Sequence, residues 1–241
     1  MALEIVQVPL LTDNYAYLLR EPKSGLVGIV DPSVAAGPLK AAEDRGWAIS
    51  HVLNTHHHWD HTGGNLEIKS ATGCTVVGPS YDADRIPGID QEVSEDAPFK
   101  FGATEAEIIF IPGHTLGHIA FWFRKEKAAF VGDTLFAMGC GRLFEGTPEM
   151  MFASMQKLKK LPDDTKIYCG HEYTLNNGEF AMGLDPGNAA IKERMDDVYA
   201  RRAESLPTVP SFMGEEKKTN PFLLAPDVKS FAEVRAKKDR Y

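Results

Sequence analysis

The sequence predicts an α/β (α+β) protein, on three observations. Short apolar runs recur along residues 1–172 and have the length and residue types of β-strands. Segments with helical features separate some of these runs. From residue 173 onward, charged and periodic segments without strand character follow. We therefore expect a mixed body over residues 1–172 and a small helical domain over residues 173–241.

Strands are expected from the N-terminus onward. The first lies within residues 1–15, because this stretch has no basic segment and carries Glu4 inside its apolar run, unlike a secretion signal. The further expected strands are residues 15–20, 26–31, 49–55, 74–79, 107–113, 118–124, 128–133 and 166–170. No apolar run approaches the length that spans a membrane, so we expect no membrane partner.

Helices are expected where charged residues alternate with apolar ones. Thr147 is a suitable N-cap, Pro148 fits the first helical position, and Pro162 ends the segment. The expected helices are residues 147–161, 187–206 and 227–241.

Composition limits the choice of partners and compartment. The chain has 26 Lys and Arg against 34 Asp and Glu, and its net charge of −8 argues against nonspecific nucleic-acid binding. Its three cysteines, Cys74, Cys140 and Cys169, show no pairing pattern, which favours reduced thiols and a cytoplasmic protein. The oligomeric state stays open, with a monomer as the preferred expectation.

Polar residues at the ends of the expected strands indicate one site. Ends of buried strands are where a rigid sheet presents side chains to a ligand. The residues in this position are Asp31, His56, His114, Asp133 and His171.

The stretch THHHWDHTGGN, residues 55–65, has the spacing of metal ligands. In an extended segment alternate side chains share a face, so His56 and His58 can bind one ion while His57 points away. Asp60 and His61 follow as the chain turns, and they could bind a second ion nearby. Imidazole and carboxylate ligands suit Zn, Fe(II) or Mn(II).

Other histidines and the cysteines are expected to have ordinary structural roles. His51, His57 and His118 are expected to be hydrogen-bonded residues outside the ligand set, and Cys140 and Cys169 are expected to pack. For Asp31 two roles remain open, capping a turn or orienting a ligand histidine from behind.

Four segments together resemble the metallo-β-lactamase superfamily, and within it the glyoxalase II family, the hydroxyacylglutathione hydrolases. They are residues 55–65, PGHTLGH (112–118), FVGDTLF (130–136) and CGHEYTLNN (169–177). GCGRLFEG (139–146), and CGHEY followed by a helical domain, narrow the resemblance to this family. It implies an αββα sandwich over residues 1–172 as the catalytic domain, and a helical substrate-binding domain over residues 173–241.

The resemblance also implies the roles of single residues. His56, His58 and His114 would hold one divalent ion, Asp60, His61 and His171 would hold a second, and Asp133 would bridge the two. Asp60 and Asp133 would also act in catalysis, by orienting the hydroxide that attacks the substrate.

The implied reaction is hydrolysis of S-(2-hydroxyacyl)glutathione, such as S-D-lactoylglutathione, to glutathione and a 2-hydroxy acid, such as D-lactate, in methylglyoxal detoxification. The expected substrate contacts are Arg142, Phe144, Tyr173 and Lys217. Arg142 and Phe144 stand where the family commonly has Lys and Tyr, and Gly214 stands where it has Arg. These differences leave open whether glutathione or another thiol carries the acyl group.

Two other functions remain open from the sequence. One is an iron-dependent glutathione persulfide dioxygenase, which the segment GCGR would suit. The other is a non-catalytic metal-binding protein with the same fold. The helical domain and CGHEYTLNN favour the hydrolase over the first, and the complete set of seven candidate ligands argues against the second.

Overall fold

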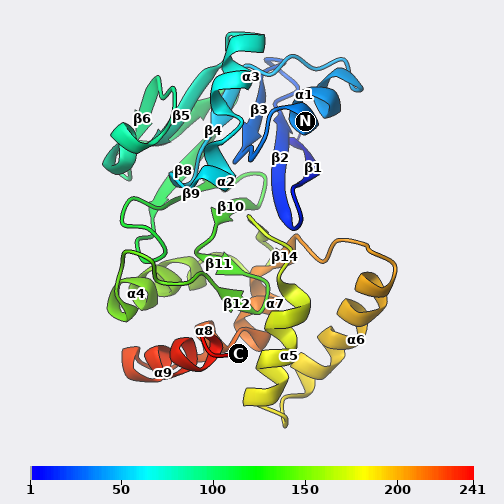
Figure 1. Ribbon diagram of the computed structural model, residues 1–241, viewed down its shortest axis with the longest axis vertical. Coiled ribbons are helices and arrows are strands. Elements are labelled where there is room, and N and C mark those ends of the chain that lie inside the picture. Colours follow the sequence, from blue (N-terminus) through cyan, green and yellow to red (C-terminus); the bar gives the residue numbers. More distant parts are fainter. Residues whose placement is uncertain (1) are drawn as a thin grey trace.

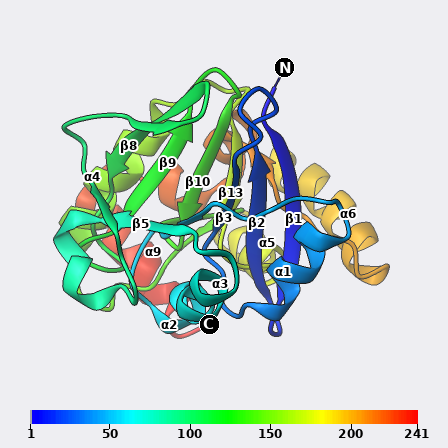
Figure 2. The same ribbon diagram turned by 90° about the horizontal axis from the view of Figure 1, so that it is seen from above.

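The computed structural model describes residues 2–241 and has two six-stranded β-sheets packed face to face, with helices on the outer faces (Figures 1 and 2). The first sheet has the strand order β1-β2-β3-β4-β5-β6 and the second β14-β13-β10-β9-β8-β7. A short hairpin, β11-β12, lies between the sandwich and the C-terminal helices in Figure 1. The predicted αββα sandwich is therefore confirmed.

The first sheet comes from the N-terminal part of the chain. Its strands are β1 (Glu4–Leu10), β2 (Asn14–Arg20), β3 (Val27–Val30), β4 (His51–Leu53), β5 (Thr75–Pro79) and β6 (Gln91–Val93). The helical segments between them are α1 (Ala36–Glu43), α2 (Trp59–Thr62), α3 (Asn65–Thr72) and the 3₁₀ segment η1 (Ser80–Arg85). Strands β1 to β3 are antiparallel, and β3 to β6 run parallel.

The second sheet closes the sandwich. Its strands are β7 (Phe99–Phe101), β8 (Thr104–Phe110), β9 (Ile119–Phe123), β10 (Ala128–Gly132), β13 (Lys166–Cys169) and β14 (Ser211–Phe212), and the short hairpin consists of β11 (Leu135–Phe136) and β12 (Gly139–Cys140). Helix α4 (Pro148–Lys159) precedes β13, and the Thr147 hydroxyl caps it by accepting a bond from Met150 N. The predicted cap and helix are thus confirmed.

Strand β2 shows how the sequence builds the layers. Its residues alternate between two apolar clusters because successive side chains of a strand point to opposite faces. Tyr17 and Leu19 lie in the core between the sheets. Ala16 and Leu18 belong to the core that includes Ala42 of α1 and Ile68 of α3. All six residues are buried, so β2 is covered on both faces.

The C-terminal part is helical, as predicted, but it is not free of strands. Its helices are α5 (Thr174–Leu184), α6 (Ala189–Ala203), α7 (Met213–Thr219), α8 (Pro221–Leu224) and α9 (Val228–Lys238). Strand β14 adds to the edge of the second sheet by pairing with β13. Two residues are too few to give a periodic pattern, so this strand is defined only by its tertiary partner.

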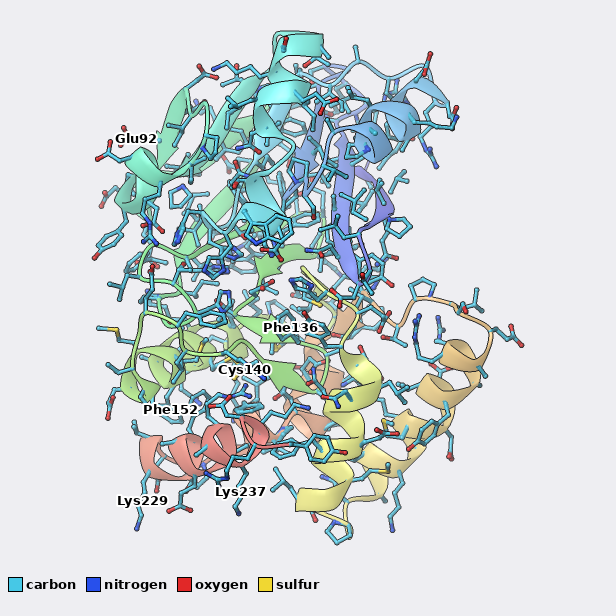
Figure 3. The ribbon with its side chains drawn as sticks, viewed as in Figure 1. Glu92, Phe136, Cys140, Phe152, Lys229 and Lys237 are labelled. Carbon is cyan, nitrogen blue, oxygen red and sulfur yellow. The ribbon has the colours of Figure 1, made fainter. Side chains whose placement is uncertain are left out.

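The last helix folds back onto the body. Helix α9 packs on α4, and the rings of Phe152 and Phe231 lie 5.9 Å apart. Figure 3 shows Phe152 between these helices, and Lys229 and Lys237 of α9 pointing away from the body. Within residues 2–241, no helix combines the length and the apolar character needed to cross a bilayer.

Candidate functional site

The candidate metal ligands come from segments that follow strands of both sheets. His56 and His58 follow β4, Asp60 and His61 lie in α2, His114 follows β8, Asp133 follows β10, and His171 follows β13. The sheets hold the ends of these strands in a fixed register. All seven residues gather at one place, beyond the ends of these strands.

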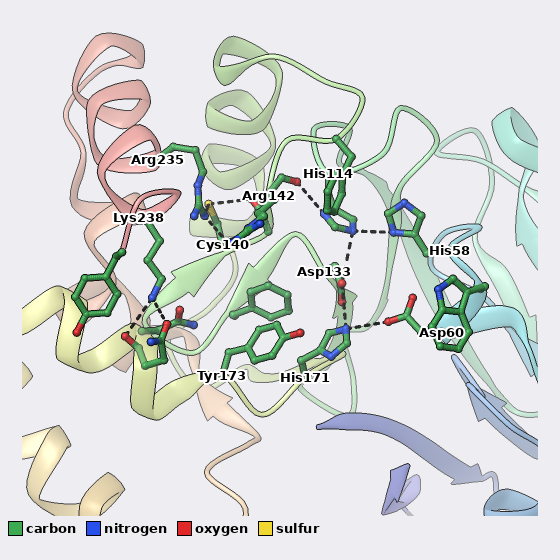
Figure 4. A pocket seen from close by; sticks show the side chains of 17 residues that line it. His58, Asp60, His114, Asp133, Cys140, Arg142, His171, Tyr173, Arg235 and Lys238 are labelled. Atoms are coloured by element: carbon green, nitrogen blue, oxygen red, sulfur yellow. Dashed lines mark hydrogen bonds and ion pairs between the residues drawn. The ribbon is translucent and has the colours of Figure 1, made fainter. Parts of the chain in front are cut away.

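Three histidines form one half of the site. His58 Nδ1 lies 3.2 Å from His56 Nε2 and 3.0 Å from His114 Nε2. Figure 4 shows His58 and His114 directed toward one another. Nitrogen atoms at such separations fit neighbouring ligands of one tetrahedral ion, whose metal–nitrogen bonds are about 2.0–2.1 Å.

Asp60, His61 and His171 form the other half, and Asp133 lies between the two. Asp60 Oδ2 is 3.4 Å from His171 Nε2 and 3.6 Å from His61 Nε2. Asp133 Oδ2 is 3.2 Å from His171 Nε2 and 3.5 Å from His114 Nε2. One carboxylate oxygen therefore reaches a ligand of each half.

Buried polar atoms test whether these residues suit a metal. Among residues 2–241, the site-facing Nε2 of His61 and Oδ1 of Asp133 are buried without a hydrogen-bond partner. Such orphaned groups are rare in native proteins, and a missing ion is one recognised reason for them. The nitrogen and carboxylate donors also match the preferences of Zn, Fe(II) and Mn(II). The site fits divalent-metal binding.

The surrounding residues explain the roles of the polar groups outside the ligand set. Asp31 accepts bonds from Thr55 N (2.8 Å) and Thr55 Oγ1 (2.7 Å), and its Oδ2 lies 3.2 Å from His61 Nδ1. The structure thus places Asp31 behind His61, a candidate ligand histidine. His57 faces Asp82 (2.9 Å), away from the ligands, and His118 Nε2 accepts a bond from Asp133 N (3.1 Å).

The two halves differ in their electrostatics. In the three-histidine half, burial lowers the pKa of His58 to about 4 and also lowers the pKa of His56 and His114. In the other half, burial opposes protonation, but Asp133 and further carboxylates outweigh it and raise the pKa of His61 to about 10 and that of His171 to about 11. The second half therefore attracts positive charge more strongly.

A cavity of about 690 Å³ opens from the candidate ligands toward the C-terminal helices. Its size is within the usual range for a small-molecule site. The residues that line it are His58, Trp59, Asp60, His114, Asp133, Phe136, Cys140, Gly141, Arg142, Phe144, His171, Tyr173, Asn176, Asn177, Arg235, Lys238 and Tyr241 (Figure 4).

Comparison with known proteins identifies the family. The metallo-β-lactamase superfamily model matches residues 11–171, and the model of the hydroxyacylglutathione hydrolase C-terminus matches residues 172–241. The hydroxyacylglutathione hydrolase of Methylococcus capsulatus is 53% identical, and the match covers 98% of each chain. The chain belongs to the hydroxyacylglutathione hydrolase family.

Solved structures with lower sequence identity share the fold. ETHE1 from Myxococcus xanthus superimposes with a TM-score of 0.74 at 21% identity, covering 98% of this chain and 90% of that one. A structure described as TTHA1623 in a di-iron-bound form has a TM-score of 0.64 at 24% identity, covering 91% and 100%. Both likenesses support the sandwich observed here.

Three of the four residues that were expected to contact the substrate line the cavity. The Phe144 ring lies 5.2 Å from the ring of His114 and 5.7 Å from that of His58. Tyr173 stacks on His171 with 4.7 Å between ring centroids. Burial raises the pKa of Tyr173, so its hydroxyl stays protonated and can donate a hydrogen bond. Arg142 also lines the cavity.

Lys217 is the exception, and its expected role needs correction. Its ammonium group donates to Leu161 O (2.9 Å) and Asp163 Oδ1 (2.6 Å), away from the residues that line the cavity. Gly214 faces the same loop, through a bond from its N–H to Asp163 O. Lys217 thus serves the contact between α7 and the loop before β13.

The sequence analysis did not identify two cationic residues of α9, Arg235 and Lys238, that line the cavity. Arg235 donates to Cys140 O (2.8 Å), and Lys238 donates to the side-chain and backbone oxygens of Asn176, the latter at 3.1 Å. Burial, with Arg235 and Arg142 nearby, lowers the pKa of Lys238 to about 8. The spacing of three residues, which puts Arg235 and Lys238 on one helix face, was the available signal.

The cysteines have the packing roles that the sequence favoured. All three are buried and unpaired. Burial raises the pKa of Cys140 to about 11 and that of Cys169 to about 12, so neither provides a thiolate at neutral pH. Cys140 lines the cavity as a small apolar side chain.

Proposed function

We propose that this chain hydrolyses S-(2-hydroxyacyl)glutathione, taking S-D-lactoylglutathione to glutathione and D-lactate in methylglyoxal detoxification. One observation carries the proposal: a metal-binding end and a cationic end share one cavity, with Arg142, Arg235 and Lys238 at the latter. Glutathione carries two carboxylates, and cations bind carboxylates through strong charge-assisted bonds. A thioester that spans the cavity would place its carbonyl at the metal end and its carboxylates at the cationic end.

Two divalent ions, Zn, Fe or Mn, would occupy the two halves of the site, with Asp133 between them. Their ligands would be His56, His58, His114, Asp60, His61, His171 and Asp133. Such ions lower the pKa of water from 15.7 to about 7 and polarise a carbonyl oxygen. The fold neighbour in a di-iron-bound form supports the number two.

The chain's own residues would orient and bind the reactants. Burial raises the pKa of Asp60, but His171, His61 and Asn14 outweigh it and lower that pKa below its usual value. The ionised Asp60 can therefore accept a hydrogen bond from the attacking water and aim it, together with Asp133. Tyr173, which stacks on His171, would donate a hydrogen bond from its hydroxyl to the thiol carrier.

The remaining features of the chain favour this function over its alternatives. The family match over residues 172–241 is to the hydrolase C-terminus, which favours hydrolysis over the persulfide dioxygenase and the non-catalytic protein. Three buried, unpaired thiols support a cytoplasmic location, because reducing compartments keep cysteines in this form.

The direct test is release of free thiol from S-D-lactoylglutathione, with metal per chain counted on the same sample. We expect turnover with close to two ions per chain. A matched substrate, S-D-lactoyl-N-acetylcysteamine, has the same acyl group without the carboxylates, and it should have a higher KM. Absence of turnover in the loaded enzyme would contradict the proposal, and oxygen consumption with glutathione persulfide would then favour the dioxygenase.

A further inference from the structure

One turn holds two ligands of the Asp60–His61–His171 half from behind. The turn between β1 and β2 carries Asp13, and Asn14 follows it as the first residue of β2. Asp13 Oδ1 lies 2.8 Å from His171 Nδ1. Asn14 Nδ2 donates to Asp60 Oδ2 (3.2 Å) and to Asp60 O (3.1 Å). Asp13 contacts the ring nitrogen of His171 that faces away from the site, whereas Asn14 contacts the Asp60 oxygen that faces His171 Nε2 and thereby fixes this carboxylate.

Backbone bonds fix this turn to the other sheet. Tyr15 N donates to Gly170 O (2.8 Å), and Glu172 N donates to Asp13 O (2.9 Å). An isolated antiparallel bridge pairs Asn14 with His171. The turn of the first sheet is therefore locked to the segment after β13, and it sets how His171 lies relative to Asp60.

In the three-histidine half, two of the histidines have neutral groups in the corresponding positions. His56 Nδ1 lies 3.0 Å from the Thr55 hydroxyl, and His114 Nδ1 lies 2.8 Å from the Arg142 carbonyl oxygen. A carboxylate behind a ligand histidine fixes its ring and makes it a stronger ligand, and its loss lowers metal affinity about 10–100-fold. Carboxylates stand behind both histidines of the other half, Asp31 at His61 and Asp13 at His171.

We propose that Asp13 and Asn14 are positioning residues that make the Asp60–His61–His171 half the tighter of the two ion sites. Retention of its ion then depends on a turn that contributes no ligand. This inference rests on the two-ion site of the proposed function.

Withdrawal of zinc from the zinc-loaded protein by increasing concentrations of a chelator tests the inference. Zinc per chain is counted for wild type, Asp13→Ala and a matched control, Thr12→Ala, an exposed neighbour in the same turn. In Asp13→Ala we expect the Kd of one ion to rise about 10–100-fold. The Kd of the other ion should stay within about 3-fold of its wild-type value. Thr12→Ala should match wild type, and Asp13→Asn, which keeps an acceptor oxygen, should fall between.

A second pair of variants assigns the weakened ion to its half. With His58→Ala in the background, Asp13→Ala should weaken the remaining ion by the same factor. With His171→Ala in the background it should have no effect, because the ring that Asp13 holds is gone. Thermal unfolding of each chain is measured alongside, to show that the fold is kept.

The outcomes separate this inference from the proposed function. A single ion in wild type contradicts the two-ion site and the inference together. Two ions held equally well by wild type and Asp13→Ala overturn the inference alone. Equal weakening of both ions, or an effect that persists with His171→Ala, also overturns it, because either result indicates a general loss of structure.

Discussion

The two ends of the cavity are built in different ways. The metal end consists of short side chains at strand ends, most of them buried and held by further bonds, and its charges are carboxylates. The far end consists of long cationic side chains, two of them from the last helix. Groups that take part in chemistry must be held rigidly, and rigid sheets achieve this better than loops. Under the proposed function, the metal end would carry out turnover and the far end would recognise the thiol carrier.

The strongest test of this division is Asp133→Ala at the metal end. Because Asp133 lies between the halves, we expect kcat to fall on the order of 10³-fold, since metal ions supply several kcal/mol of charge stabilisation. Zinc counted on the same sample should show fewer ions than in wild type. Near-normal turnover with two ions would remove Asp133 from the bridging role.

At the far end, Lys238→Met should act on KM instead. A hydrogen bond to a charged group contributes about 1.5–3 kcal/mol, so KM for S-D-lactoylglutathione should rise about 10- to 100-fold. The value of kcat should stay near that of wild type, because Lys238 would bind the substrate equally strongly in the ground state and in the transition state. Lys237→Met, on the outer side of the same helix, is the matched control and should leave both constants unchanged (Figure 3). A fall in kcat with KM unchanged would contradict the assignment of carrier binding to the far end of the cavity.

The pH dependence of KM sharpens the same comparison. The pKa of Lys238 is lowered to about 8, so its ammonium is charged below that pH and lost above it. KM should therefore rise several-fold as the pH passes through 8 toward 10, without a parallel change in kcat. Lys238→Arg keeps its charge in this range and should flatten the profile. A profile that is equally steep in Lys238→Arg would assign the titration to another group.

The smallest effect is expected from Lys217→Ala. Neither Lys217 nor its ion-pair partner Asp163 lines the cavity, so KM should stay within about 2-fold of wild type. Stability should drop by about 0–1 kcal/mol, as for other partly exposed ion pairs, measured by denaturant unfolding. A clear rise in KM would restore Lys217 to the binding site and weaken the assignment to α9.

The same division explains which residues the sequence could predict. Candidate metal ligands such as His56 and His58 are encoded by local spacing, because one strand end fixes their geometry. Lys238 looks the same in sequence as Lys237, and only the docking of α9 distinguishes them. Asp13 is an ordinary turn residue until the fold brings His171 next to it. Sequence reasoning therefore recovered the local geometry, and it failed where a role depends on contacts between distant segments.

The bond from Arg235 to the Cys140 carbonyl joins residues 95 positions apart, and this separation has a consequence for how the protein is made. Because Arg235 lies in α9, this bond can form only after that helix has been synthesised. During synthesis every metal ligand leaves the ribosome before α9 does. Under the proposed function, a nascent chain therefore contains its candidate ligands before it contains the α9 cations that would recognise a carrier.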